Sequence, residues 1–368
     1  MAQKLFSEAK LGTLTLQNHV VMAPMTRSRA LGNIPNDMIA EYYAQRATAG
    51  LIITEGTAPS PNGLGYARIP GIYNAEQVEG WKKVTAAVHD KGSRIFVQLM
   101  HTGRISHLAN MPSGAEVVAP SAIAAAGSIW TDTEGLVPNA TPREMTSEDV
   151  QSAIQEFAQA AKNAVEAGFD GIELHGANGY LIEQFLSARS NQRTDEYGGP
   201  VENRARFVLD VAAAAIAAIG ADRVGVRLSP FGAAGDLMPH AEDTHDLYVY
   251  LAHKLQELGV VYIHLVDHSS QGAPAVPQET VDAIRAAFKG TLILCGNYDT
   301  ERAEADLESG RADLIAFGRP FIANPDLVER LQTGAELAQF DASTFFAPGP
   351  KGFEQGFIDY PALAEAQV

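Results

Sequence analysis

The chain has 368 residues, of which 46% are hydrophobic and 19% charged, and a formal net charge of −17 at pH 7. This composition is typical of a globular protein with ample material for a core. An acidic chain without a run of Lys or Arg repels nucleic acid and anionic membrane surfaces, so we expect neither as a partner. No apolar run reaches about 18 residues and the N-terminal segment lacks a signal-peptide core, so we expect no membrane span and a cytoplasmic location.

The chain has a single cysteine, Cys295. One cysteine cannot form an intramolecular disulfide, which fits a reducing compartment. The residue ends an apolar run that is typical of a strand interior. We therefore expect a buried, inert thiol rather than a nucleophile.

In chain order, short apolar runs rich in β-branched residues predict eight strands, at residues 20–24, 51–56, 94–99, 171–175, 223–229, 261–266, 291–296 and 313–317. Amphipathic patterns, several with an N-cap residue or a terminal glycine, predict eight helices, at residues 36–50, 74–92, 146–168, 202–220, 241–259, 276–290, 299–310 and 324–334. Uninterrupted apolar strands are expected where both faces of a parallel sheet are buried. The alternation predicts an α/β TIM (β/α)8 barrel, with residues 1–368 as a single domain.

An open, doubly wound sheet is the alternative, but no GxGxxG motif follows the first predicted strand. Three segments exceed a minimal barrel. Residues 5–18 predict a hairpin that plugs the bottom of the barrel, and residues 340–368 an irregular C-terminal tail. Residues 101–145, rich in Gly, Pro, Ala and Ser, form a long excursion after the third strand, which we expect to cap the site.

The active site of a TIM barrel lies at the carboxyl ends of its strands, and the loops after strands 7 and 8 commonly bind phosphate. Here those loops contain Gly296, Asn297, Gly318 and Arg319. Glycine backbones allow close approach and an arginine binds phosphate in a bidentate manner, so we expect a phosphorylated ligand. The alternative is that Arg319 pairs with an acidic neighbour.

Two polar residues lie inside predicted strands, Gln98 and Arg227. A strand-interior arginine is costly unless it meets an anion or a hydrogen-bonding ligand, so together they indicate a polar, planar ligand. The loop after the fourth strand adds His175 and Asn178, which can donate to one oxygen, and Tyr180, a proton donor at neutral pH. This trio fits polarisation of a carbonyl or nitro group followed by protonation.

A metal-dependent hydrolase is the rival interpretation. Its ligands would be the strand-end histidines, His101, His175, His264 and His268. No spacing among them is specific for a metal, and Arg227 would lie near the ion, so we expect no metal.

Longer motifs carry a resemblance to a known family: MAPMTRSRA (22–30), ITEGTAPSPNGLGY (53–66), VQLMHTGR (97–104), HGANGYLIEQFLSARSNQRTDEYGG (175–199), VGVRLSP (224–230) and AFGRPFIANPDL (316–327). In this order they resemble the Old Yellow Enzyme family of flavin-dependent ene-reductases, and bacterial N-ethylmaleimide and 2-cyclohexenone reductases in particular. The resemblance implies a TIM barrel that binds FMN noncovalently and takes hydride from NADPH or NADH. Its substrates would be activated alkenes such as enones, enals and maleimides, with nitro compounds as a further candidate class.

Carried over residue by residue, the resemblance implies FMN contacts from Pro24, Met25, Thr26, Ala58, Gln98, Arg227, Gly296, Asn297, Gly318 and Arg319. His175 and Asn178 would bind the oxygen of the activating group, and Tyr180 would protonate the α-carbon after hydride from flavin N5 reaches the β-carbon. Glycines 176 and 179 would permit the tight path of this loop. Tyr66, Met100, His268 and Phe346 would line the substrate pocket.

Departures from the family pattern limit the implied specificity. Asn178 stands where some members have a second histidine, and Met100, His268 and Phe346 stand where aromatic residues or a tyrosine are common. The pocket is therefore expected to be less aromatic than usual. The intact His175, Asn178 and Tyr180 set argues against a flavin sensor without turnover, and the negative charge argues against a flavoenzyme that acts on tRNA. A monomer or homodimer is expected.

Overall fold

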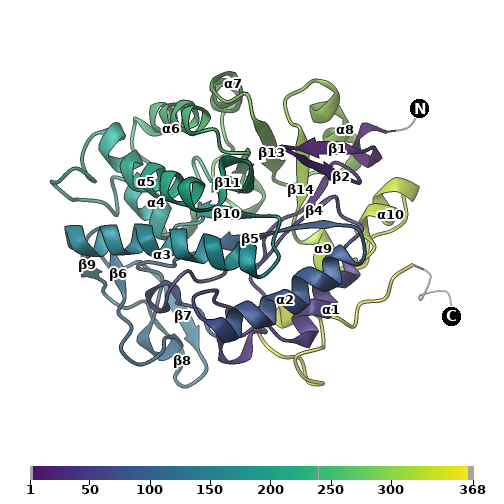
Figure 1. The fold of residues 1–368 in the computed structure, drawn as a ribbon, viewed down its shortest axis with the longest axis horizontal. Helices are drawn as coiled ribbons and strands as arrows, with labels where there is room; N and C mark the ends of the chain where they lie inside the picture. The colour runs from purple at the N-terminus through teal and green to yellow at the C-terminus, as the bar shows by residue number, and fades with distance from the viewer. Residues whose placement is uncertain (1–2, 239, 364–368) are drawn as a thin grey trace.

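The computed structural model describes residues 3–238 and 240–363 and confirms the predicted TIM barrel (Figure 1). Eight parallel strands close in the order β10-β11-β12-β13-β14-β3-β4-β5. Their bounds are β3 Val20–Met22, β4 Leu51–Ile53, β5 Arg94–Leu99, β10 Gly171–Gly176, β11 Val224–Leu228, β12 Tyr262–Val266, β13 Thr291–Cys295 and β14 Leu314–Phe317. Their ends lie within two residues of the predicted strands, except that β4 ends three residues earlier than predicted.

Helices surround the barrel, and the eight predicted ones all occur. The α-helices of the described residues are α1 Asp37–Gln45, α2 Ala75–His89, α3 Ser147–Glu166, α4 Leu181–Leu186, α5 Val201–Ile219, α6 Thr244–Leu258, α7 Gln278–Ala287, α8 Thr300–Glu308, α9 Pro320–Ala323 and α10 Leu327–Thr333. The sequence did not indicate α4 and α9, because six and four residues are too few to show a helical period. Short 3-10 helices lie at Lys4–Phe6, Leu31–Asn33, Pro61–Gly63, Leu108–Asn110, Ala221–Arg223, Ala234–Asp236, Ser269–Gln271 and Ala342–Thr344.

The strands are apolar because both of their faces are covered. All six residues of β10 are buried, as are all five of β11 and of β12. Outside them, α3 starts at a capping box, in which Thr146 and Asp149 exchange side-chain and backbone hydrogen bonds. Its apolar stripe, which includes Ile154 and Phe157, packs into the main core.

The N-terminal hairpin closes the bottom of the barrel, as predicted. β1 (Ala9–Leu11) pairs antiparallel with β2 (Leu14–Leu16). Leu11 and Leu16 are fully buried and form a cluster with residues inside the barrel, among them Phe96 and Tyr262. The amino ends of the barrel strands are therefore sealed, and the opposite ends are left for a site.

The excursion of residues 101–145 carries two small sheets. β6 (Val118–Ala119) pairs parallel with β9 (Arg143–Glu144), and β7 (Ser128–Thr131) forms a hairpin with β8 (Gly135–Pro138). In Figure 1 this hairpin lies across the molecule from β1 and β2. The excursion is thus at the end of the barrel that the N-terminal hairpin leaves open.

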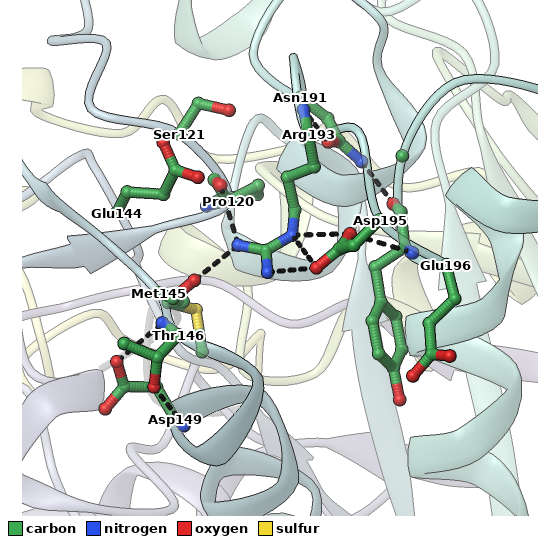
Figure 2. Close-up of polar contacts among 12 residues, drawn as sticks. Pro120, Ser121, Glu144, Met145, Thr146, Asp149, Asn191, Arg193, Asp195 and Glu196 are labelled. Atoms are coloured by element: carbon green, nitrogen blue, oxygen red, sulfur yellow. Dashed lines mark hydrogen bonds and ion pairs between the residues drawn. The ribbon is translucent and has the colours of Figure 1, made fainter.

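A buried arginine fastens this excursion to the barrel (Figure 2). Arg193, in the loop between α4 and α5, donates from Nη1 to the carbonyl oxygens of Pro120 (3.1 Å) and Met145 (2.5 Å). Its Nε donates to both carboxylate oxygens of Asp195, at 3.0 and 3.2 Å. One side chain of the NQRTDEYGG motif therefore joins the residues that directly follow β6 and β9 of the excursion.

The C-terminal tail, described to residue 363, runs over the barrel with one 3-10 helix and one isolated bridge. Arg29 is fully buried and donates to the carbonyl oxygens of Thr344 (2.7 Å) and Phe345 (2.9 Å). Arg27 donates to the carbonyl of Gly356 at 2.6 Å. These two arginines, just after β3, hold the tail against the carboxyl end of the barrel.

Candidate active site

A cavity of about 880 Å³ opens at the carboxyl ends of the barrel strands. Its size is in the range of cofactor and substrate sites. Most of the predicted site residues line it: Pro24, Met25, Thr26, Tyr66, Gln98, Met100, His175, Asn178, Tyr180, Arg227, His268, Arg319 and Phe346. They come from seven of the eight barrel strands or the loops after them and from the tail, so the fold brings together residues more than 300 positions apart.

Four predicted FMN contacts lie outside this lining. Ala58 is fully buried in a small cluster with Met100. Gly296 and Asn297 follow β13 and Gly318 follows β14, and these strands pair up to Cys295 and Ala316. Their loops are therefore neighbours, next to Arg319 at the cavity wall.

Arg319 is exposed and its guanidinium has no hydrogen bond or ion pair within the described chain, so the acidic partner considered as an alternative is not found there. An exposed guanidinium beside two glycine loops suits an anionic group such as a phosphate.

The prediction for the single cysteine needs a correction. The sequence predicted a buried thiol, but Cys295 is half-buried. Burial nevertheless raises the pKa of its thiol, with a smaller opposing effect from Arg227.

The loop after β10 presents His175, Asn178 and Tyr180 to the cavity. The ring centroids of His175 and Tyr180 lie 4.9 Å apart in an edge arrangement, and the Tyr180 hydroxyl donates to the Tyr66 hydroxyl at 3.2 Å. Both glycines of the loop are required by geometry. Gly179 has φ +80°, and a Cβ there would lie 2.6 Å from the backbone of Gly235; a Cβ at Gly176 would lie 2.9 Å from the carbonyl of Arg227.

Burial keeps the loop's two ionisable groups uncharged. It lowers the pKa of His175 well below its ordinary value, and the nearby charge of Arg227 adds to this effect. Burial also raises the pKa of Tyr180, although Tyr66 and Arg227 oppose it. At neutral pH the loop therefore offers a neutral imidazole and a protonated phenol.

Beneath the cavity, a buried carboxylate orients Gln98. Glu173, on β10, accepts from the Gln98 amide at 2.8 Å, from His264 Nδ1 at 2.8 Å and from the Tyr262 hydroxyl at 3.0 Å. Burial opposes its ionisation, but His264, Arg227 and Gln98 outweigh that effect and hold the pKa of Glu173 below its ordinary value. Because the Gln98 nitrogen is engaged, its oxygen is left for a ligand.

Buried polar atoms without partners test whether FMN fits. Within the described chain, Arg227 Nε, His175 Nδ1 and Asn178 Oδ1 have no hydrogen-bond partner, and all three residues line the cavity. Buried polar groups are rarely left unpaired, so these atoms indicate bound ligands. A guanidinium and a free amide oxygen at the cavity floor match the acceptors and the N–H of a flavin pyrimidine edge. The residues present therefore fit FMN.

The histidines do not support the metal alternative. His101 is buried, and burial lowers its pKa to about 3. Its Nδ1 accepts from the Gly103 amide at 3.1 Å, and His264 Nδ1 is engaged by Glu173. Over residues 3–238 and 240–363, no group of three or more His, Cys, Asp or Glu is arranged to hold a metal ion.

Sequence reasoning missed the rim of the cavity. Trp130, on the β7–β8 hairpin, lines it while 55% exposed, and its indole nitrogen donates to Asp132 at 3.1 Å. Asp132 pairs with Arg68, which also donates to the carbonyl of Phe346 at 2.8 Å. The rim thus joins the excursion to the tail. The only sequence signal was the length of the excursion, which indicates a lid but not its residues.

The barrel and the unpaired polar atoms of its cavity fit a flavin-binding protein with its cofactor at the carboxyl ends of the strands. Residues 4–338 match the model of the NADH:flavin oxidoreductase / NADH oxidase family. The chain belongs to this family, that of Old Yellow Enzyme, as its motifs indicated. It is an FMN-dependent oxidoreductase that uses a nicotinamide hydride donor.

Similar proteins cover nearly the whole chain. 12-oxophytodienoate reductase 7 of Oryza sativa subsp. japonica is 41% identical over 98% of this chain and 95% of its own length. Morphinone reductase has 44% identity and a TM-score of 0.94, covering all of this chain and 98% of its own. The old yellow enzyme homologue of Zymomonas mobilis has 40% identity and a TM-score of 0.92 over 98% of this chain and all of its own.

Among the described residues no helix is long and apolar enough to cross a membrane.

Proposed function

We propose that this protein is an ene-reductase for alkenes conjugated to a carbonyl, imide or nitro group. The observation that carries the proposal is the loop after β10, which presents a neutral imidazole, an amide and a protonated phenol to one cavity. These are the groups that alkene reduction needs: two donors for the activating oxygen and one acid for carbon. Two similar proteins are named for 12-oxophytodienoate and morphinone, both carbonyl compounds by name.

His175 and Asn178 would bind the activating oxygen of the substrate. Negative charge grows on that oxygen as hydride arrives at the β-carbon, and donors already in place lower the barrier without reorganisation. The Nδ1 of His175 is buried and unpaired, and a hydrogen bond to the substrate oxygen is stronger in such a setting than in water. Tyr180 would then give its proton to the α-carbon, and the hydrogen bond that its hydroxyl donates to Tyr66 keeps that hydroxyl in place beforehand.

FMN, when bound, supplies the hydride that it has accepted from the nicotinamide. Arg227 would meet the pyrimidine edge and stabilise negative charge there, while Gln98 would accept from the ring N–H and Thr26 would contact the ring from the loop after β3. Arg319, with the glycine loops at 296–297 and 318, would hold the phosphate. The unpaired Arg227 Nε and the Glu173 bond to Gln98 support these assignments.

The hydride donor and the alkene would use the same cavity in turn. Morphinone reductase has been solved in complex with tetrahydroNAD, which supports a nicotinamide in this site. We propose NADH or NADPH as the donor and a cytoplasmic monomer or homodimer as the working form. Met100, His268 and Phe346 would shape the substrate end of the cavity together with Tyr66.

Replacing Tyr180 by Phe tests the proposal directly. The variant keeps the ring and removes the acid, so we expect reoxidation of the reduced enzyme by 2-cyclohexenone to slow by about 10²-fold or more. Flavin reduction by the nicotinamide needs no proton from Tyr180 and should change less than about threefold. Stopped-flow absorbance measures both steps.

A loss of equal size in both half-reactions would contradict the role of Tyr180 as the acid. The control is Tyr197→Phe, because Tyr197 is buried beyond the cavity, where its hydroxyl bonds Asp210 and Gln151. That variant should leave both rates within about twofold of the unmodified enzyme.

A further inference from the structure

The backbone of the active-site loop is held in an unfavourable conformation. Asn178 has φ +61° and Gly179 φ +80°, so two consecutive residues are left-handed. For a non-glycine residue this conformation persists only where its surroundings fix it. The direction of the Asn178 side chain therefore depends on what holds these two residues.

Two hydrogen bonds fix the amides of this pair. The Asn178 N–H donates to Ser229 Oγ at 3.0 Å, and the Gly179 N–H donates to Glu183 Oε2 at 2.6 Å. Ser229 in turn donates to Glu183 Oε1 at 2.6 Å. Both amides are thus tied, one directly and one through a serine, to a single carboxylate.

Glu183 is buried, with 5% of its surface exposed, and does not line the cavity. Its remaining contact is the Tyr248 hydroxyl, which donates to Oε1 at 3.0 Å. The next residue of α4 holds the loop from the other side, because the Gln184 amide donates to the carbonyl of Gly179 at 2.8 Å. Three donors on a buried carboxylate form a satisfied network, which rigidifies what it contacts.

We propose that Glu183 is a positioning residue of the active site. It fixes the Gly179 amide directly and the Asn178 amide through Ser229, and so orients Asn178 and Tyr180 toward the cavity. The inference rests on the proposed function of this loop. The simpler alternative is that Glu183, an acidic residue in the first turn of α4, only stabilises that helix. Ser229 separates the two, because it lies just after β11 and reaches the loop but is not part of the helix.

The experiment compares four variants of the FMN-loaded enzyme. Glu183→Ala removes both ties, and Ser229→Ala removes the tie to Asn178 alone. Tyr248→Phe is the matched control, because it removes a donor to the same carboxylate that does not touch the loop. Glu183→Gln retains an acceptor for the Gly179 amide and a donor for the hydroxyls, so it should rescue.

Two readouts are measured for each variant. The first is hydrogen–deuterium exchange at the amides of residues 178 and 179, which needs no turnover. The second is the dissociation constant of 2-cyclohexenone for the oxidised enzyme, followed by the flavin spectrum. We expect Glu183→Ala to raise both the exchange rates and the dissociation constant by about tenfold or more, the scale of one lost buried hydrogen bond. Ser229→Ala should raise them less, with the Asn178 amide affected more than that of Gly179.

Tyr248→Phe and Glu183→Gln should stay within about threefold of the unmodified enzyme in both readouts. The inference is overturned if Glu183→Ala leaves the exchange rates and the dissociation constant unchanged. If Glu183→Ala does not fold, the Ser229→Ala variant tests the inference in its place. The inference is then overturned if the exchange rates and the dissociation constant of Ser229→Ala equal those of Tyr248→Phe. An unmodified enzyme that binds no enone would refute the proposed function instead. The amide exchange rates would then still test whether Glu183 fixes the backbone of residues 178 and 179.

Discussion

At the scale of single residues, the acid of the site keeps its proton under alkaline conditions. Burial raises the pKa of Tyr180, and the smaller opposing effects of Tyr66 and Arg227 do not reverse this. A group with a raised pKa remains protonated to a higher pH than the free side chain, which loses its proton near pH 10. We therefore expect the rate of reoxidation by 2-cyclohexenone to stay above half of its value at pH 8 over the range from about pH 8 to 10.

Stopped-flow measurements across that range check this expectation. A rate that falls tenfold per pH unit from below about pH 9 would mean that the acid ionises early and that the buried setting of Tyr180 is not what controls it. The Tyr180→Phe variant is the control, because its slow residual rate has no tyrosine to titrate at this position.

The sequence predicted site residues that lie close together along the chain. It missed residues whose partners lie far away along the chain. His175, Asn178 and Tyr180 lie within six positions at a strand end, so their proximity could be read directly. The supports of this loop could not be, because Ser229 reaches Glu183 across 46 positions. Glu173 was a signal that went unused: a charged residue inside an apolar strand calls for buried partners, and the fold supplies His264 from 91 positions away.

At the scale of elements, one arginine should decide how firmly the excursion is attached. Arg193 is buried and joins Pro120, Met145 and Asp195 (Figure 2). Replacing it by Met leaves two buried carbonyls unpaired, so we expect a loss of about 2–4 kcal/mol in the free energy of unfolding and faster proteolysis within residues 118–145. Denaturant unfolding and limited proteolysis measure the two effects.

Arg143 provides the matched control. It lies on the same excursion and bonds Glu116 and Asp149, but its side chain is 42% exposed. Exposed ion pairs contribute little, so Arg143→Met should cost less than about 1 kcal/mol and leave the cleavage pattern unchanged. Equal losses in the two variants would contradict the anchoring role of Arg193.

Element positions could largely be predicted, because strands that are buried on both faces leave uninterrupted apolar runs in the sequence. The attachments between elements could not. Arg29 binds carbonyl oxygens of the tail more than 300 positions away, and backbone carbonyls leave no mark in a sequence. The same holds for Trp130, whose place at the cavity rim depends on the path of a whole excursion.

At the scale of the whole molecule, the two ends of the barrel carry separate tasks. The hairpin seals one end through Leu11, which is fully buried among residues of the barrel interior, and the cavity lies at the other end. Leu11→Ala should therefore lower the free energy of unfolding by about 2–5 kcal/mol. Thermal or denaturant unfolding measures this, and FMN content and enone binding should remain unchanged.

Leu136 is the control for that substitution, because it is 68% exposed on β8. Leu136→Ala should change the free energy of unfolding by less than about 0.5 kcal/mol. If Leu11→Ala instead lost FMN while keeping its stability, the separation between the sealed end and the catalytic end would be wrong.

The visible spectrum of the purified protein, recorded anaerobically, tests the central claim most directly. Spectra are taken before and after addition of NADH or NADPH, and again after 2-cyclohexenone. We expect flavin bands that bleach with at least one nicotinamide and return with the enone. Bands that bleach but do not return would contradict alkene reduction, and a colourless protein that cannot be reconstituted with FMN would contradict the flavin site itself.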